Sequence, residues 1–367
     1  MKGRLIMDSK YYMMWLFQSL GLNIRKTWLL LNEFNSPENV WNAEERIIES
    51  VVKDTKTYRM LEKGKGLLPG WIEEVEKCGL RYISINESDY PKLLREIHEP
   101  PVGIYIKGNL PDFDEMPYIS IIGARRCSEY GRNMAYKFSK ELAKDGFTIV
   151  SGMAKGIDSL GHKGALDVGG ATVAVLAFGH CHCYPSENRE LMKVIGEKGC
   201  LLSEYPPDTP SNRFNFVQRN RIIAGISKGL FVVEAGRKSG TLTTVDFAGD
   251  SGRVIMALPS NITSLSGQGT NDLIKEGCPM ITKVEDIYFE LGISRKKKES
   301  KKEKNGGLIL DKEEKMVYSI LSYDAVGFDY IADKIKMEIP EIQYILTMLE
   351  LKGAIQKLPG ERYIRSL

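Results

Sequence analysis

Short apolar runs alternate with amphipathic segments through the middle of this chain, and this alternation constrains the fold more than any other feature. Each run is short and continuous, as in a strand buried on both faces, and each segment between runs has helical periodicity. This order predicts an α/β fold with a doubly wound parallel sheet and helices on both faces. The expected strands are 118–122, 147–150, 171–178, 200–203, 229–233 and 253–258, and the expected helices are 131–145, 158–168, 187–198, 216–227 and 241–251.

Smaller domains are expected at both ends of the chain, which at 367 residues is long enough for two or three domains. Residues 1–80 predict a small helical domain, and residues 81–292 form the α/β domain. Residues 309–367 predict three helices and a closing hairpin, which is the order of a winged helix. Within the first domain, helices are expected at 11–20, 24–34 and 40–53.

A charged segment, residues 293–308, separates the last two domains. The stretch RKKKESKKEKNGG within it has no apolar side chain that could anchor it to a core. Such runs usually stay hydrated, so we expect a solvated linker, although clustered lysines can also contact nucleic acid.

The net charge of the chain is close to zero. Lys and Arg total 51 and Asp and Glu total 48, which gives +3. A protein that binds polyanions over its whole surface is far more basic, so any nucleic acid is expected at a local site. The chain lacks an apolar run of the roughly 18 residues that span a bilayer and lacks a signal-peptide pattern, and its six scattered cysteines suit reduced thiols. We therefore expect a cytoplasmic protein without a membrane partner.

Glycines and basic residues follow three of the expected strands. Ligands of open α/β sheets bind outside the carboxyl ends of the strands, where these loops would meet. Glycine lets the backbone approach an anion, helix starts favour negative charge, and arginine and lysine add charge-assisted contacts. Any one glycine could simply be a turn residue, but three loops with the same basic bias predict a phosphate site. The candidates are Gly123, Arg125, Arg126, Ser151, Gly152, Lys155, Gly156, Ser239, Gly240 and Thr241.

A fourth element, residues 213–225, interleaves basic and aromatic side chains. Arg219, Asn220 and Arg221 stand at the start of an apolar helical stretch, and Phe214 and Phe216 lie just upstream. Guanidinium groups on phosphates, together with rings on bases, hold a single nucleic-acid strand without reading its sequence. The three polar residues are therefore candidate phosphate ligands. The two phenylalanines are candidates for base stacking, with burial in the core as the alternative.

Motifs for nucleotide cofactors and metals are absent or incomplete. IIGARRCSEYG does not supply G-x-G-x-x-G, and GMAKGIDS is not a P-loop, so no cofactor and no nucleotide hydrolysis are expected. In an extended segment 180–183 (HCHC), alternate side chains face opposite ways, so we expect no metal site there. Asp158, Glu204 and Glu234 could form an acid–base or Mg²⁺ set, but beside so many arginines we expect them to pair with guanidinium groups. No catalytic residue is assigned.

Several motifs resemble those of one known family. IIGARRCSEYG, SGMAKGIDSLGHKGAL, YPSEN, LLSEYPP, RFNFVQRNRIIAGISKGLFVVEAGRKSGTLTT and GTNDLIKEG have the order and spacing of the DNA-processing protein A family, also called DprA or Smf. The resemblance covers residues 82–291 and is most specific at QRNRIIAG and EAGRKSGTLTT. Residues 19–41 are more loosely similar to the sterile-alpha-motif-like helical domain of that family.

The resemblance implies an extended Rossmann fold that binds single-stranded DNA. It also implies a cytoplasmic bacterial homodimer that protects incoming single strands and loads the RecA recombinase onto them during natural transformation, with single-strand-binding protein as a further candidate partner. By motif, Arg125 matches the DNA-contacting arginine of the first loop, and 152–156, 219–221 and 239–241 match the other three elements. The chain departs from the family pattern at Pro259-Ser260, at His180–Cys183 and at Ser186.

The third helix expected in the winged helix, residues 340–352, tests whether this domain reads DNA. A recognition helix that binds DNA is basic, but this one contains Glu341, Glu350 and only Lys352. Its outer face suits a protein partner better than a phosphate backbone, so we expect this domain not to be the principal DNA site. Its expected core stripe is Ile342, Ile345, Leu346 and Leu349.

Two other functions fit parts of the sequence. Nucleoside-monophosphate phosphoribohydrolases, a related Rossmann family, have a Gly-Gly-x-Gly-Thr loop followed by a catalytic glutamate, and EAGRKSGTLTT is similar to that loop. Val245 and Asp246 stand where the glutamate would be sought, which argues against this enzyme. The third candidate is an adaptor whose winged helix binds RecA. The expected function is a single-stranded DNA-binding protein that is not an enzyme.

Overall fold

The structure, a computed structural model, describes residues 7–113, 117–295, 310–322, 325–335 and 337–365. The chain forms two compact units, 1–294 and 295–367. Almost all of the expected linker at 293–308 lies outside the described residues.

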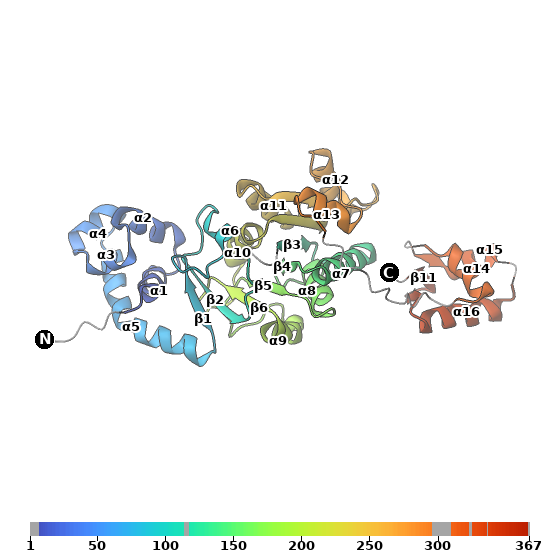
Figure 1. Ribbon diagram of the computed structural model, residues 1–367, viewed down its shortest axis with the longest axis horizontal. Coiled ribbons are helices and arrows are strands. Elements are labelled where there is room, and N and C mark those ends of the chain that lie inside the picture. Colours follow the sequence, from blue (N-terminus) through green and yellow to red (C-terminus); the bar gives the residue numbers. More distant parts are fainter. Residues whose placement is uncertain (1–6, 114–116, 296–309, 323–324, 336, 366–367) are drawn as a thin grey trace. The chain divides into compact units, whose positions relative to one another are not determined.

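An eight-stranded sheet forms the centre of the first unit (Figure 1). Its strands are β1 (Arg81–Ser84), β2 (Gly103–Gly108), β3 (Tyr118–Gly123), β4 (Thr148–Ser151), β5 (Thr172–Leu176), β6 (Cys200–Ser203), β7 (Gly229–Glu234) and β8 (Val254–Ala257). They lie in the order β1-β2-β6-β5-β4-β3-β7-β8, and the last six are parallel to one another. All six strands expected from the apolar runs are present, which confirms the doubly wound parallel sheet.

Strands β1 and β2 form an antiparallel edge that the sequence did not predict. They pair with each other in antiparallel fashion, and β2 pairs antiparallel with β6. Each has an exposed charged residue, Arg81 in β1 and Lys107 in β2, so neither has the continuous apolar character of a strand buried on both faces.

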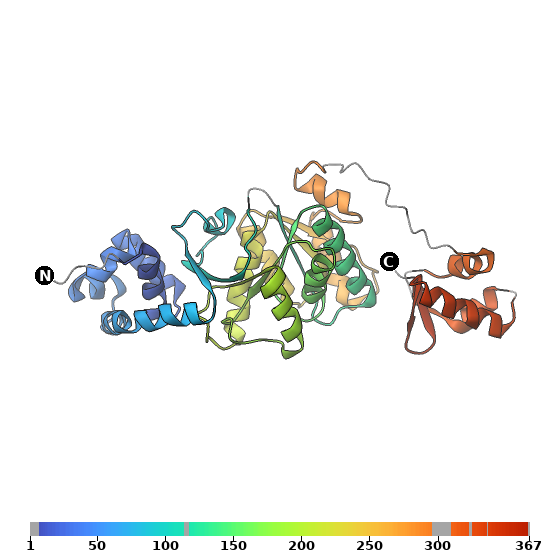
Figure 2. The ribbon, with the colours of Figure 1, turned by 60° about the horizontal axis from the view of Figure 1, so that its bottom comes forward.

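Helices cover both faces of the sheet (Figures 1 and 2). The side-chain period of two in β7 explains this arrangement: Phe231 and Val233 join one apolar cluster with α7 and α13, whereas Leu230 and Val232 join another with α10 and α11. These helices and their neighbours are α6 (Lys92–Arg95), α7 (Glu129–Lys144), α8 (Ile157–Leu166), α9 (Arg189–Lys198), α10 (Arg213–Ile226), α11 (Thr241–Asp250), α12 (Gln268–Lys275) and α13 (Val284–Glu290).

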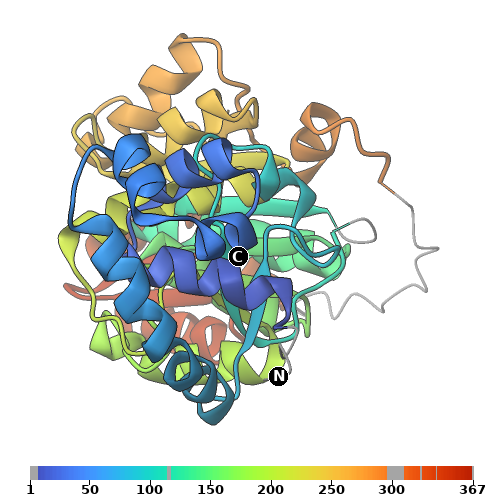
Figure 3. The same ribbon diagram turned by 90° about the vertical axis from the view of Figure 1, so that its left-hand side faces the viewer.

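Five helices precede the sheet and gather beside its β1–β2 edge (Figures 1 and 3). They are α1 (Ser9–Ser19), α2 (Ile24–Phe34), α3 (Pro37–Asn42), α4 (Glu45–Val52) and α5 (Thr57–Lys77). The sequence predicted only three helices here and missed α5, because its glycines and Pro69 interrupt the helical pattern. Gly64 is required by packing, since a Cβ at that position would lie 1.8 Å from Ser19 Oγ. The expected boundary at residue 80 falls between α5 and β1, within the first unit.

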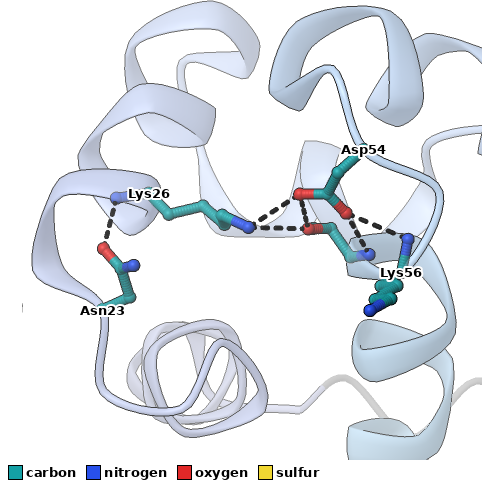
Figure 4. Close-up of polar contacts among 5 residues, drawn as sticks. Asn23, Lys26, Asp54 and Lys56 are labelled. Atoms are coloured by element: carbon teal, nitrogen blue, oxygen red, sulfur yellow. Dashed lines mark hydrogen bonds and ion pairs between the residues drawn. The ribbon is translucent and has the colours of Figure 1, made fainter.

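A polar cluster around Asp54 joins α2 to α5 (Figure 4). Lys26 Nζ donates to Asp54 Oδ2 at 2.7 Å and to Thr57 Oγ1 at 3.1 Å. Asp54 Oδ1 accepts from the backbone N–H groups of Lys56 at 2.9 Å and Thr57 at 2.7 Å. Hydrogen bonds from Lys26 and then Thr57 hold the pKa of Asp54 well below its usual range. This carboxylate therefore stabilises the first turn of α5 and ties it to α2.

The second unit has the three helices and hairpin expected of a winged helix. Its elements are α14 (Lys312–Ile320), β9 (Val326–Gly327), α15 (Phe328–Lys334), α16 (Ile339–Leu351), β10 (Ile355–Leu358) and β11 (Arg362–Arg365). The stripe expected to form its core is buried: Ile342, Ile345, Leu346 and Leu349. None of the described helices of the chain is long and apolar enough to span a lipid bilayer.

Candidate nucleic-acid interface

The candidate site lies where the order of the parallel strands reverses. β3 pairs with β4 on one side and with β7 on the other, so the loops after β3 and β7 lead to helices on opposite faces. Doubly wound sheets bind ligands at such a point. A cleft of about 680 Å³ opens there. It is lined by Ile122, Gly123, Ala124, Arg125, Ala154, Asp158, Tyr184, Arg213, Phe216, Val217, Arg219, Asn220, Ile223, Ser239, Gly240, Thr241, Thr243 and Thr244.

The cleft brings together about half of the residues predicted from the sequence. Those that line it are Gly123, Arg125, Phe216, Arg219, Asn220, Ser239, Gly240 and Thr241. Those that lie outside its lining are Arg126, Ser151, Gly152, Lys155, Gly156, Phe214 and Arg221. The two groups have different structural roles, which their contacts define.

Two exposed arginines reach the cleft. Arg125 follows β3, and Arg213 is the first residue of α10. Within the part of the chain that the structure describes, no carboxylate forms an ion pair with either guanidinium. The Arg125 guanidinium lies 5.6 Å from the ring centroid of Phe216. Both cations can therefore contact an anion without first giving up an ion pair.

Arg219 lies in the floor of the cleft and is almost fully buried, with 3% of its surface exposed. Its Nη1 donates to the carbonyl of Gly152 at 2.9 Å and also to the carbonyl of Val175. Burial lowers the pKa of the guanidinium to about 10, so it stays charged at neutral pH. The main role of Arg219 is to join the loop after β4 to β5. Because the side chain is almost fully buried, only a small part of the guanidinium can contact a ligand.

Arg221 points away from the cleft, although it is only two residues from Arg219. Residues two apart on a helix do not share a face. Arg221 Nη2 donates to Glu204 Oε1 at 2.7 Å in an ion pair whose side chains are 5% and 4% exposed. Burial opposes the charge of Arg221, but Glu204 outweighs it and raises the pKa. This pair confirms the expected pairing role of Glu204.

Carboxylates of the chain already accept backbone hydrogen bonds in two of the three glycine loops at this edge. Glu234 accepts hydrogen bonds from the backbone N–H of Ser128 at 3.1 Å and from its hydroxyl at 2.9 Å, so it caps α7. The expectation that Glu234 pairs with an arginine was therefore wrong, because its carboxylate is engaged at this helix start. Asp158 Oδ2 accepts from the backbone N–H groups of Gly152 at 3.1 Å and Ala154 at 3.4 Å, before α8.

The start of α11 has no carboxylate. Its first turn contains no acidic residue, and Gly240, its N-cap, faces open space in the direction of a Cβ. Ser239 Oγ accepts from the backbone N–H of Thr241 at 3.2 Å and donates to Thr241 Oγ1 at 2.9 Å. Of the three loops predicted to bind phosphate, this one has the helix start most accessible to an external anion.

Three predicted residues at the end of β4 and in the loop after it are structural. Ser151 is buried, and its hydroxyl donates to the carbonyl of Ile121 at 2.6 Å. Gly152 leaves space for Arg219, since a Cβ there would lie 2.7 Å from Nη2. Gly156 has φ +80° and would bring a Cβ within 2.4 Å of the Ala124 carbonyl oxygen. Both glycines are thus needed to build the cleft floor rather than to contact a ligand.

The other predicted residues outside the cleft are exposed. Lys155 forms an ion pair with Glu187, and Arg126 projects from the loop after β3 without lining the cleft. Phe214 is 69% exposed, so it is neither a core residue nor a wall of the cleft.

The aromatic wall of the cleft consists of Phe216 and Tyr184. Their ring centroids are 5.3 Å apart in an edge-to-face arrangement, and Tyr184 is 47% exposed. The guanidinium carbons of Arg125 and Arg219 lie 5.6 Å and 5.9 Å from the Phe216 ring. An exposed ring beside guanidinium groups is an arrangement that can hold a planar base next to its phosphate.

Comparison with known proteins assigns the family. Residues 81–292 match the family described as DNA recombination-mediator protein A, and residues 302–361 match the DprA winged helix domain. The chain belongs to the DNA processing protein A (DprA/Smf) family. This membership confirms the resemblance seen in the motifs and the α/β fold with a winged helix after it.

Relatives of this family match over much of the chain. Protein Smf of Synechocystis sp. is 36% identical over 271 residues, 72% of this chain and 68% of that protein. DNA processing protein DprA of Bacillus subtilis is 36% identical over 61% of this chain and 75% of that protein. The X-ray structure of DprA from Streptococcus pneumoniae aligns with a TM-score of 0.68 at 33% identity, covering 78% of this chain and 99% of that one. DNA processing protein A of Helicobacter pylori, whose structure concerns its single-stranded DNA binding mode, aligns with a TM-score of 0.52 at 26% identity, over 58% and 97%.

The sequence did not predict two residues that line this cleft, Tyr184 and Arg213. Tyr184 precedes Pro185 in the YPSEN motif, so an aromatic beside a proline in a loop at the sheet edge was an available signal. Arg213 directly precedes Phe214 in the sequence. Its position at the first residue of α10 places it on the rim, and this depends on where the helix begins.

The segment His180–Cys183 contains a turn instead of being extended as expected, and its two histidines have separate partners. His180 Nε2 lies 3.3 Å from the carbonyl oxygen of Leu201, and His182 Nε2 lies 3.1 Å from Asp208 Oδ1. The described residues contain no group of three or more His, Cys, Asp or Glu side chains that could hold a metal ion.

Proposed function

We propose that this chain binds single-stranded DNA in the cleft between the loops after β3 and β7. The observation that supports this most directly is the convergence of three features there. They are two exposed arginines and a start of α11 that have no carboxylate partner among the described residues, together with an aromatic wall. Phosphates would contact Arg125, Arg213 and the Ser239–Thr241 turn, and a base would pack against Tyr184 and Phe216.

The proposed contacts favour a single strand over a duplex. In a duplex the bases are stacked on each other and present only their edges, whereas the rings of the cleft need a free base face. The cations bind phosphates, which are the same in every sequence, so little sequence preference is expected. Carboxylates of the chain already accept from backbone N–H groups of the loops after β3 and β4, which leaves the start of α11 as the strongest candidate anion site.

The phosphoribohydrolase alternative receives little support from the cleft. Asp158 is the one carboxylate among its described lining residues, and its oxygen already accepts two backbone hydrogen bonds. Burial raises the pKa of Asp158, and the charge of Arg219 and the two backbone N–H groups oppose this effect only in part. Val245 is buried and Asp246 is exposed on α11, outside the lining.

The partners follow from the family and remain part of this proposal. We infer that the protein acts in the cytoplasm as a homodimer, protects incoming single strands during natural transformation and loads RecA onto them, with single-strand-binding protein as a further partner. Family membership as a recombination mediator supports this role. The test is RecA filament formation on strands coated with single-strand-binding protein, with and without the full chain.

A titration tests the binding function itself. The full chain is titrated with a single-stranded oligonucleotide, the matching duplex and AMP, each at two salt concentrations. We expect the single strand to bind at least tenfold tighter than the duplex, AMP to bind weakly without release of adenine, and affinity to fall with salt. Release of adenine from AMP would establish the enzyme instead, and absence of strand binding would leave the adaptor role.

A further inference from the structure

Two cysteines from distant parts of the chain lie next to each other. Cys78 is the C-cap of α5 in the helical segment, and Cys181 lies in the loop after β5. Their Sγ atoms are 3.5 Å apart, although 103 positions separate them in sequence. Both are free thiols, and Cys181 is exposed. A disulfide has its sulfur atoms about 2.05 Å apart, so closing the bond requires a movement of about 1.5 Å.

We propose that Cys78 and Cys181 form an oxidisable pair that closes a disulfide between the helical segment and the loop after β5. The proposal does not depend on DNA binding. Hydrogen peroxide supplies the oxidation: the exposed Cys181 sulfur attacks the O–O bond and becomes a sulfenic acid with release of water. The Cys78 sulfur then displaces the sulfenic hydroxyl as a second water, so two thiols lose two electrons and peroxide gains them.

Both backbones around the pair are held in place, so the sulfur atoms stay close. The N–H of Cys181 donates to the carbonyl of Pro207 at 2.9 Å, and the N–H of Cys78 donates to that of Glu74 at 3.0 Å. Gly179 packs against the Pro206 and Pro207 carbonyls so tightly that a Cβ would lie within 2.2 Å of both oxygen atoms. A bond between two fixed segments costs little further ordering, which favours its formation.

The surroundings of the pair set its rate of oxidation. Burial, the Cys78 thiol and the nearby carboxylates of Asp208 and Glu74 raise the pKa of Cys181, so little thiolate exists at neutral pH. Because the thiolate is the nucleophile, the pair would oxidise slowly. We therefore expect a crosslink that accumulates under sustained peroxide and stabilises the first unit, rather than a fast sensor.

The neighbouring cysteine provides a matched control. Cys183 is partly buried two residues from Cys181, and its Sγ lies 3.5 Å from the carbonyl oxygen of Pro185. If closeness in sequence decided which thiols react, Cys181 would form a disulfide with Cys183. The described geometry instead selects Cys78.

The experiment treats the full chain with hydrogen peroxide, blocks remaining thiols with N-ethylmaleimide and maps peptides without reduction. We expect the Cys78–Cys181 crosslink at least fivefold above any Cys181–Cys183 product, faster migration in a non-reducing gel, and a thermal midpoint that rises and falls back after dithiothreitol. Cys78→Ser should abolish all three effects and Cys183→Ser should keep them. Two results would overturn the proposal. One is recovery of Cys78 and Cys181 as maleimide adducts or as separate sulfinic acids, and the other is a dominant Cys181–Cys183 disulfide.

Discussion

The cleft at the sheet edge differs from the third helix and wing of the winged helix in how the cations are engaged. In the cleft, Arg125 and Arg213 are exposed and have no carboxylate partner among the described residues. In the winged helix, Lys352 Nζ donates to both oxygens of buried Glu314 at 2.6 Å. The cations of the β10–β11 wing are engaged as well: Lys357 with Glu361 at 3.5 Å, Arg362 with the Pro359 carbonyl at 3.2 Å, and Arg365 with the Tyr318 carbonyl at 2.8 Å.

From this difference we expect the availability of cations to predict an anion site better than their number. A cation that already neutralises a buried carboxylate, such as Lys352 beside Glu314, loses that interaction when it contacts a phosphate. An exposed cation without a protein partner loses only part of its hydration when it contacts a phosphate, which costs much less free energy. The same distinction applies within the cleft, because Arg219 is buried and bonded while Arg125 is exposed.

The largest expected effect is a loss of unfolding free energy when Arg219, the buried arginine of the cleft, is replaced. Arg219→Met leaves the carbonyls of Gly152 and Val175 without a donor and the buried carboxylate of Asp158 without a nearby positive charge. Loss of one buried charged partner costs about 3–5 kcal/mol of unfolding free energy. Denaturant unfolding measures it, and the matched Arg125→Met should cost less than about 0.5 kcal/mol. Equal losses in the two variants would remove the distinction between structural and available arginines.

The next largest expected effect is a loss of affinity for single-stranded DNA when the two exposed arginines of the cleft are removed. Arg125→Ala combined with Arg213→Ala should weaken single-strand binding about a hundredfold, at about 1.4 kcal/mol for each charge-assisted contact. The slope of log affinity against log salt should fall by about 1.4, because each phosphate contact on a single strand contributes about 0.7. Fluorescence anisotropy at several salt concentrations provides both numbers.

A second double variant controls for net charge. Arg126→Ala with Lys155→Ala removes the same charge from residues that the motifs also nominated but that lie outside the cleft lining. We expect less than a threefold loss of affinity. A loss equal to that of the cleft variant would mean that the strand follows the loops beyond the cleft.

The sequence was sufficient for the six parallel strands and for the edge where the cleft opens, because buried parallel strands are continuous apolar runs and their loops share one edge. It was insufficient for the antiparallel strands β1 and β2, and wherever a contact decides the role of a residue. Gly64 lies inside α5, where Ser19 packs so closely that no space remains for a Cβ. Helix α5 was missed because its glycines and Pro69 interrupt the helical pattern.

The same limit applies to the site residues. Arg219 and Arg221 belong to one motif, but residues two positions apart in a helix of 3.6 residues per turn lie on different faces of the helix. The period alone could have shown that they do not act together. The role of Glu234 could not be foreseen, because its partner Ser128 is 106 positions away in sequence. A glycine loop whose N–H groups are free for a ligand has the same local sequence pattern as one whose N–H groups already donate to a carboxylate of the chain. Only contacts between distant segments distinguish the two.

A smaller effect tests whether the open start of α11 contacts phosphate. Gly240 has φ −60° and open space at its Cβ position, so Gly240→Ala should leave stability unchanged or slightly raised. The added methyl would obstruct close approach of a phosphate, and we expect about a fivefold loss of single-strand affinity, near 1 kcal/mol. Gly249→Ala, in the last turn of the same helix, is the matched control and should bind normally. Equal binding by both variants would remove α11 from the proposed site.

The smallest effect is expected in the winged helix. Lys357→Ala with Arg362→Ala removes two exposed cations from the wing of the full chain, each already engaged by a neighbour within the hairpin. Single-strand affinity should change less than twofold at moderate salt, because neither cation is available in the way Arg125 is. Anisotropy titration beside the cleft double variant measures this. A tenfold loss would show that engaged cations exchange their partners for phosphate at little cost, and the winged helix would then count as a second strand-binding surface.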